Sequence, residues 1–334
     1  MMKKTIFLVI VLMILTNCAK PSGVENALSI EAHIQTSGYA VDFSLTDDYI
    51  FIAEDQRGFS IYNRENHEQI SQVDSLDMDW SVTHFENVKK IDANQDGEIL
   101  FVYDRYGSPA SINIYDISQP DSAQFIFQIA ANTGNVQKTM TSLQNEDETL
   151  LIWTNSASIN VGYYGYNEEY ETTMWNPLNS LDLPNAVKGF DAIDTCVVIA
   201  AEQSGIYIVH SEANEITSSL DLPGEATDVN IVDNYAFVTI RQEGFAIVDI
   251  SDIYNPQLIH IQEVNELIYT IDIEDNYLVV SSHSGGVLLY DITEVMSPQL
   301  IGQIDEIGYT YKVEIEDGKI YAATRSGIYK IKIN

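Results

Sequence analysis

The chain has 334 residues, of which 50 are acidic and 16 are basic, so its formal net charge is −34. This length allows one large domain or two ordinary ones, and a hydrophobic content of 45% is that of a folded globular protein. The charge excludes a nucleic-acid binder and a protein that adsorbs to anionic lipid through a basic patch, because both need a positive surface. Two cysteines, Cys18 and Cys196, are too few for a disulfide framework or a cysteine-based zinc site.

Residues 1–17 are predicted to be a secretory signal. Two lysines precede an unbroken apolar run from Ile6 to Leu15, which is shorter than the about 20 residues of a membrane-spanning helix. The segment ends Leu-Thr-Asn-Cys and resembles a bacterial lipoprotein signal, in which cleavage precedes a cysteine that then carries lipid. Asn17 departs from the small residue that is usual before the cysteine. The alternative is an ordinary signal peptide that is cut elsewhere, with Cys18 incidental.

The lipoprotein resemblance implies that lipid on Cys18 holds the protein to a membrane of the bacterial cell envelope, at the outer membrane or the cell surface. Removal of residues 1–17 deletes two lysines and no acids, so the mature charge becomes 14 − 50 = −36. Residues 18–27 are predicted to be a short tether, and residues 28–334 a single domain.

Short apolar alternation broken by Gly, Asn, Asp and Pro predicts strands and tight turns from residue 28 onward. Turn glycines recur at 205, 244, 286 and 327, which are 39, 42 and 41 residues apart. A four-stranded repeat of about 40–45 residues is typical of a propeller blade. Seven such units are predicted, with six or eight as alternatives, and their turn elements lie near Gly58, Ala110, Ser158, Gly205, Gly244, Gly286 and Gly327.

The last unit ends at residue 334 and lacks a fourth strand. The segment Leu28–Ile34 alternates as a strand at the other end of the chain. We therefore expect an all-β, seven-bladed β-propeller in which this N-terminal strand completes the last blade and closes the ring, leaving no exposed edge.

The segment from Asp92 to Glu98 is the best metal candidate. Oxygen ligands at alternate positions with a glycine at the sixth suit a hard cation such as calcium, and the candidate ligands are Asp92, Asn94, Asp96 and Glu98. Tyr103 stands where an EF-hand loop needs a bidentate glutamate, so the alternative is a polar hairpin turn. Calcium is the only cofactor that the sequence suggests, and the predicted function requires none.

A tyrosine-dense segment, residues 162–170, interrupts the repeat. Exposed tyrosines suit the binding of protein or carbohydrate, and an edge strand packed on the next blade is the alternative.

Two strings, Ala-Ile-Val-Asp-Ile-Ser at 246–251 and Leu-Leu-Tyr-Asp-Ile-Thr at 288–293, are each followed by a proline and a Leu-Ile strand. They resemble LVIVD repeats, which are β-propeller repeats of secreted and surface proteins of bacteria and archaea. The resemblance implies a propeller fold and an extracytoplasmic location, but no agreed catalytic activity, so no catalytic residue is carried over. Asp116, Asp249 and Asp291 recur at one repeat position and are predicted to cap the turn that follows.

The innermost strand of a propeller blade begins near the axis, on the same face as the loop between the second and third strands. Alignment of the units brings scarce basic residues and tyrosines to this face, at the mouth of the channel. The candidate ligand-binding residues are Asp42, Arg57, Arg105, Lys138, Lys188, Asp228, Arg241, Tyr269, Tyr311, Lys312 and Arg325. The alternative is that these residues are solvated turns and snorkelling lysines.

The sequence therefore predicts a lipid-anchored, monomeric propeller that acts as a binding or scaffold module for a protein, glycan or peptide. The alternative is a propeller hydrolase or lactonase with a metal in the central channel, which needs several inward carboxylates or histidines around one ion. The aligned inner positions offer only Asp42 and Asp228, and no nucleophile elbow or phosphate loop is present.

Overall fold

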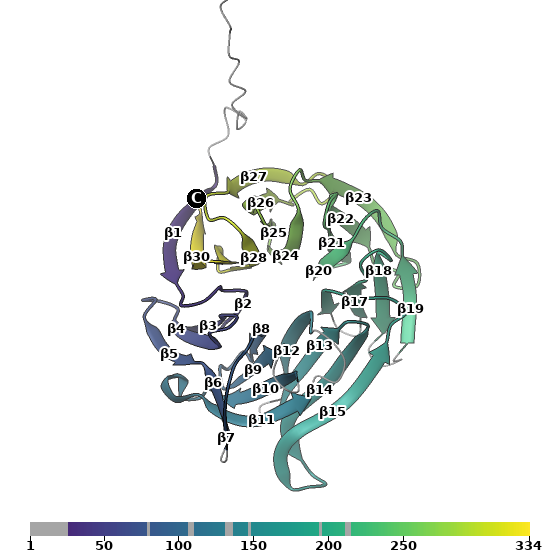
Figure 1. The fold of residues 1–334 in the computed structure, drawn as a ribbon. Helices are drawn as coiled ribbons and strands as arrows, with labels where there is room; N and C mark the ends of the chain where they lie inside the picture. Colours follow the sequence, from purple (N-terminus) through teal and green to yellow (C-terminus); the bar gives the residue numbers. More distant parts are fainter. Residues whose placement is uncertain are drawn as a thin grey trace, which may run out of the picture.

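The computed structural model describes residues 26–334 except 79–80, 106–109, 131–135, 146–147, 194–195 and 211–214. The predicted signal, Cys18 and most of the tether lie outside the described residues. The described chain forms seven four-stranded antiparallel sheets in a closed ring around a central axis (Figure 1). The seven-bladed propeller predicted from the repeats is thus confirmed. No helix in the described ranges is long and apolar enough to span a membrane.

The four strands of each blade run outward from the axis. From innermost to outermost, the seven blades are β2 (Asp42–Leu45), β3 (Tyr49–Ala53), β4 (Phe59–Asn63) and β5 (Gln69–Val73); β8 (Val88–Ala93), β9 (Ile99–Asp104), β10 (Ser111–Asp116) and β11 (Gln124–Ala130); β12 (Lys138–Asn145), β13 (Glu148–Asn155), β14 (Ser158–Asn167) and β15 (Thr172–Asp182); β16 (Phe190–Ile193), β17 (Cys196–Ala200), β18 (Ile206–His210) and β19 (Glu215–Leu220); β20 (Ala226–Val232), β21 (Tyr235–Ile240), β22 (Gly244–Asp249) and β23 (Gln257–Glu263); β24 (Ile268–Glu274), β25 (Tyr277–Ser282), β26 (Gly286–Asp291) and β27 (Gln299–Ile304); and β28 (Thr310–Glu316), β29 (Lys319–Thr324), β30 (Gly327–Ile333) and β1 (Leu28–Gln35).

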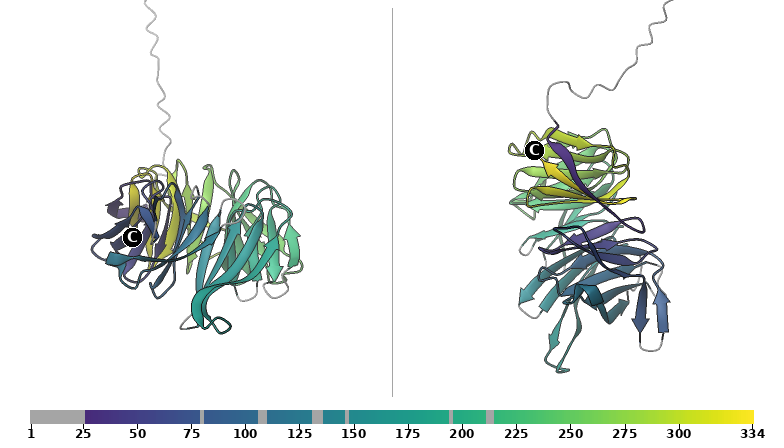
Figure 2. Two further views of the ribbon diagram at one scale, coloured as in Figure 1. Left: turned by 60° about the horizontal axis from the view of Figure 1, so that its bottom comes forward. Right: turned by 90° about the vertical axis from the view of Figure 1, so that its left-hand side faces the viewer.

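Two features account for the long spacing of the second and third units. A separate hairpin, β6 (Ser75–Met78) and β7 (Ser81–His84), lies between the first and second blades. In the third blade β14 and β15 have 10 and 11 residues and project beyond their neighbours as a long hairpin (Figure 2). The tyrosine-dense segment forms much of this hairpin, where Tyr166 and Tyr170 are exposed. The predicted turn elements all immediately precede or begin the third strand of a blade, so the repeat boundaries are confirmed.

The N-terminal strand closes the ring as predicted. β1 pairs antiparallel with β30, from Leu28 opposite Ile333 to Gln35 opposite Gly327. Gly327 has a φ of +125°, and a Cβ there would lie 2.0 Å from the carbonyl oxygen of Ile34. The junction therefore requires glycine.

The hydrophobic core is divided into seven clusters, and each cluster joins two neighbouring blades. For example, Val198 of the fourth blade and Val238 of the fifth belong to one cluster, and Phe43 of the first blade and Tyr321 of the seventh belong to another. A single blade could not bury these faces, so the apolar surface that stabilises each blade is buried only when the ring assembles.

The recurring aspartates cap turns, as predicted. The Oδ1 atoms of Asp116, Asp249 and Asp291 each accept a backbone N–H two residues further on, at 2.9, 2.9 and 2.8 Å. Asn63, which takes this place in the first blade, accepts the N–H groups of the two following turn residues, Glu65 and Asn66. The repeat position is therefore explained by turn geometry.

Candidate functional site

A cavity of about 760 Å³ lies on the axis and is lined by the innermost strands of all seven blades. Eight of the eleven predicted ligand-binding residues line it: Asp42, Lys138, Lys188, Asp228, Arg241, Tyr269, Tyr311 and Lys312. Arg57, Arg105 and Arg325 do not line it, and they belong to the loops between second and third strands on the mouth face.

Side chains line the channel in two layers. The first ring, one residue from each blade, is Asp42, Lys90, Thr139, Gly189, Asp228, Thr270 and Lys312. The second ring lies two residues further along each strand and is Ser44, Asp92, Thr141, Asp191, Asn230, Asp272 and Glu314. Because side chains of a strand alternate between faces, a step of two keeps both rings pointed at the axis.

Several channel carboxylates join neighbouring blades. Asp42, Asp191, Asp228 and Asp272 each accept, through Oδ2, a backbone N–H from the inner strand of the next blade. The donors are Ile91 at 3.3 Å, Ile231 at 2.6 Å, Ile271 at 3.3 Å and Ile315 at 2.8 Å, respectively. These acids therefore stabilise the ring as well as giving the channel its charge.

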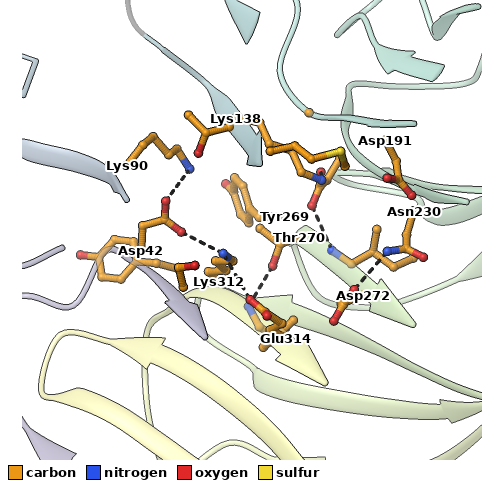
Figure 3. A pocket seen from close by; sticks show the side chains of 18 of the residues that line it. Asp42, Lys90, Lys138, Asp191, Asn230, Tyr269, Thr270, Asp272, Lys312 and Glu314 are labelled. Atoms are coloured by element: carbon orange, nitrogen blue, oxygen red, sulfur yellow. Dashed lines mark hydrogen bonds and ion pairs between the residues drawn. The ribbon is translucent and has the colours of Figure 1, made fainter. Parts of the chain in front are cut away.

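Two lysines in the channel bridge different blades, and Figure 3 shows both of them. Lys312 Nζ lies 3.3 Å from Asp42 Oδ1 and 2.6 Å from the carbonyl oxygen of Phe43. Lys138 Nζ lies 2.7 Å from Asp228 Oδ1 and thus reaches from the third blade to the fifth. Gly189 makes this crossing possible, because a Cβ there would lie 2.2 Å from the same carboxylate oxygen.

Burial and neighbouring charges shift the pKa values of the channel groups. Burial raises the pKa of Asp92 to about 7, and burial with the nearby Glu314 also raises the pKa of Asp272. Burial opposes the charge of Lys138 and Lys312, but their acidic neighbours more than offset it and raise both pKa values. The channel at neutral pH therefore holds the charged ammonium groups of Lys138 and Lys312, together with the carboxyls of Asp92 and Asp272, which titrate near pH 7 or above.

A stack of rings borders the mouth. Tyr269 and His283 stack with centroids 3.3 Å apart, and His283 and Tyr309 stack at 3.9 Å. The guanidinium of Arg241 lies 4.9 Å from the Tyr269 centroid, and that of Arg325 lies 4.7 Å from the Tyr309 centroid. Burial and then the two arginines lower the pKa of His283 to about 4, so its imidazole is neutral at pH 7.

The predicted calcium segment forms the turn between β8 and β9. Asp92 faces the channel and accepts a hydrogen bond from Thr141 Oγ1 at 3.2 Å. Asn94 Oδ1 accepts the N–H groups of Glu98 and Ile99, each at 2.9 Å, and Asp96 is exposed. In the part of the chain that the structure describes, no group of three or more His, Cys, Asp or Glu side chains is arranged to hold a metal ion. Calcium binding at this turn and a metal-dependent hydrolase site both stay predictions.

Sequence reasoning missed several residues that line the channel or its mouth. They are Lys90, Asp191, Asn230, Asp272, His283, Tyr309 and Glu314. The second ring could have been found from the sequence by stepping two residues along each inner strand from the first ring. His283 and Tyr309 lie in different loops, and only the packing of adjacent blades brings them together.

Comparison with known proteins supports the repeat and the fold. A model of the LVIVD repeat matches residues 223–263. No curated protein matches the chain in sequence. The WD40 repeats of RRP9 superpose with a TM-score of 0.71 at 15% identity, covering 92% of this chain and 97% of that one.

Two further structures show the same likeness. The structure of U3-55K gives a TM-score of 0.69 at 16% identity, covering 93% of this chain and all (100%) of that one. The computationally designed Ika8 protein gives 0.59 at 12% identity, covering 92% and 98% of the two chains. Identities this low show the fold alone. The chain therefore contains an LVIVD repeat and folds as a seven-bladed β-propeller.

Proposed function

We propose that this protein is a lipid-anchored binding module of the bacterial cell envelope, and that its ligand docks at the mouth of the channel. One observation carries the proposal: residues from all seven blades line a single polar cavity, and eight of the residues predicted for binding are among them. Propellers commonly bind partners with the loops at one end of a rigid ring, because the blades fix the loops in place.

The direction of β1 supports this arrangement. Leu28 pairs with the far end of β30, whereas Gln35 pairs with Gly327, next to the mouth loop that carries Arg325. The chain thus enters the domain from the face opposite the mouth, where Ala27 bonds to Ile301 of the outermost strand β27. A lipid on Cys18 would hold that side toward the membrane and leave the mouth accessible.

Anchoring is tested with the full-length chain and Cys18→Ala, expressed in a bacterium with a labelled fatty acid. We expect label and membrane association for the parent, and export without label for the variant. Equal labelling and membrane association of the two proteins would contradict the anchor but leave mouth binding standing.

Binding at the mouth is tested by passing the immobilised domain over solubilised envelope proteins and glycans. Tyr311→Ala at the mouth and Leu300→Ala on the outer strand β27 form the matched pair, because both remove a large side chain that is at least partly exposed. We expect loss of captured ligand only for Tyr311→Ala. Loss only for Leu300→Ala would contradict the proposal.

The eluted domain, analysed by sedimentation without ligand, is expected to be a monomer.

A further inference from the structure

A row of aromatic side chains flanked by arginines lies along one side of the mouth. We call Arg241, Tyr269, His283, Tyr309, Arg325 and Tyr39 the aromatic row. Its members come from the fifth, sixth and seventh blades and from the connection between the seventh and the first. Successive members lie 4.9, 3.3, 3.9, 4.7 and 5.9 Å apart, measured between ring centroids or from guanidinium carbon to ring centroid.

Arg325 is held in place within this row but is not neutralised. Its guanidinium lies between the rings of Tyr309 and Tyr39, and its Nε atom lies 3.4 Å from the hydroxyl oxygen of Tyr311. Among the described residues it forms no ion pair, although the chain has 50 acids and 16 bases. Its two Nη groups are therefore available to an acceptor outside the chain.

A second arginine lies beside the same segment. Arg57 is exposed in the corresponding loop of the first blade, and a Cβ on Gly38 would lie 3.0 Å from its Cγ. Gly38 directly precedes Tyr39, so Arg57 and Arg325 approach the chain segment that carries this half-exposed ring. Within the described ranges Arg57 also forms no ion pair.

Acids close to Arg57 are bound to other groups. Glu54 is buried, where its carboxylate accepts the N–H of Gly38 at 2.9 Å and the hydroxyl of Ser60. Asp55 pairs with Lys89 at 3.1 Å and also accepts from Asn87. Because these carboxylates are engaged, they leave the Arg57 guanidinium to a ligand.

The inference drawn from these contacts rests on the proposed function and specifies its ligand. We propose that the mouth between the seventh and first blades binds an acidic saccharide, whose carboxylate is held by Arg325 and Arg57 and whose ring lies against Tyr39. A planar guanidinium fork matches a carboxylate, and a tyrosine offers an apolar face with a polar edge, as a sugar ring does. Arg241, at the far end, is already paired with Glu225 at 3.1 Å, so the site is confined to the Arg325 end.

The experiment uses calorimetric titration of the exported domain with trigalacturonate as the acidic probe and galactotriose as the neutral one. We expect trigalacturonate to bind and galactotriose to bind at least tenfold more weakly. Arg325→Gln is expected to weaken the binding of trigalacturonate at least tenfold. Arg325→Lys keeps the charge but not the planar guanidinium, so it should restore only part of the lost affinity for trigalacturonate. Arg57→Gln should lower that affinity severalfold. Lys332→Gln removes one exposed charge on the outer part of β30 and should change affinity less than twofold.

Each other outcome separates this inference from the proposed function. If the two saccharides bind equally, or if Arg325→Gln and Lys332→Gln weaken binding alike, the carboxylate site is wrong. If trigalacturonate fails while a pentaglutamate peptide binds and depends on Arg325, the ligand is an acidic peptide and the saccharide is overturned. If no probe binds but capture of envelope material still depends on Tyr311, the inference fails and the proposed function stands. If that capture is also independent of Tyr311, both fail.

Discussion

Gly189 shows how one missing side chain shapes the channel. The other six blades place a side chain at this position of the first ring, and the glycine leaves the space through which Lys138 reaches Asp228. Burying an ammonium and a carboxylate is favourable only when the pair is well formed, so the free volume and the ion pair depend on each other.

Gly189→Ala is expected to lower the free energy of unfolding by about 2–3 kcal/mol. Its Cβ would lie 2.2 Å from the Oδ1 of Asp228 and 2.7 Å from the Cα of the same residue, so the inner strand of the fifth blade has to shift. Urea unfolding measures the change, with the exposed Gln95→Ala as the control that should alter stability by less than about 0.5 kcal/mol. Equal stability of Gly189→Ala and the parent would show that the strands yield without cost.

Asp92 predicts a pH dependence of stability. Its pKa rises from the ordinary value of 3.8 to about 7 in the folded chain, so the folded state binds the proton more tightly than the unfolded state between these values. Stability from this group is fully present below about pH 4 and is lost progressively as the pH rises from there to about 7. Asp92→Asn stays neutral, and its amide oxygen can still accept from Thr141. We expect its stability advantage over the parent to grow by about 2–4 kcal/mol between pH 4 and pH 8, measured by thermal unfolding. The same difference at both pH values would contradict the raised pKa.

At the scale of strands and blades, the repeat was readable because its turns have fixed chemistry. A glycine before the third strand and an aspartate after it recur, and both have a structural reason here. The second and third units were harder to align, because an extra hairpin, β6–β7, and the long β14–β15 pair interrupt the spacing. Insertions of this kind leave the ring unchanged, so the alternation of apolar residues does not predict where they occur.

The channel could be predicted only in part, for a related reason. The inner strands carry register shifts between Val88 and Lys90, Ala226 and Asp228, and Thr310 and Lys312. A bulge moves every later side chain by one place, so counting from the start of a strand does not tell which residues face the axis. Alignment of whole units found the first ring except Lys90, because the bulges recur in several blades. The aromatic row depends on contacts between loops of different blades, which no local pattern encodes.

The closing strand gives a prediction at this scale. In β1, Ile34 is 3% exposed and Ile30 is 39% exposed. Ile34→Ser is expected to cost about 2–4 kcal/mol, because it leaves a cavity and a polar group in the cluster that joins the seventh and first blades. Ile30→Ser, on the same strand, should cost less than about 0.5 kcal/mol. Thermal unfolding of the two variants measures both costs. Equal falls in melting temperature would mean that β1 does not hold the ring closed.

Across the whole molecule, part of the charge of −34 comes from acids in turns on one face of the ring. Asp233, Asp275 and Asp317 occupy turns between first and second strands with φ of +54°, +53° and +54°, where a short polar residue is favoured. Because consecutive strands alternate in direction, these acids lie on the face opposite the mouth. The mouth face carries four of the five arginines, whereas Arg64 pairs with Glu316 and Asp317 on the opposite face. The polarity of the ring, together with the entry of β1 from the opposite face, is consistent with the proposed arrangement in which the mouth faces away from a lipid on Cys18.

The central claim is that this mouth is the surface that meets the ligand. A photo-cross-linking amino acid placed at Tyr311 and, in a second protein, at Leu300 on the outer strand β27 tests it in intact cells. The account predicts a defined cross-linked adduct at position 311 and none at position 300. An adduct at position 300 with none at 311 would contradict it, because the protein would then engage its partner through the outer wall of the ring.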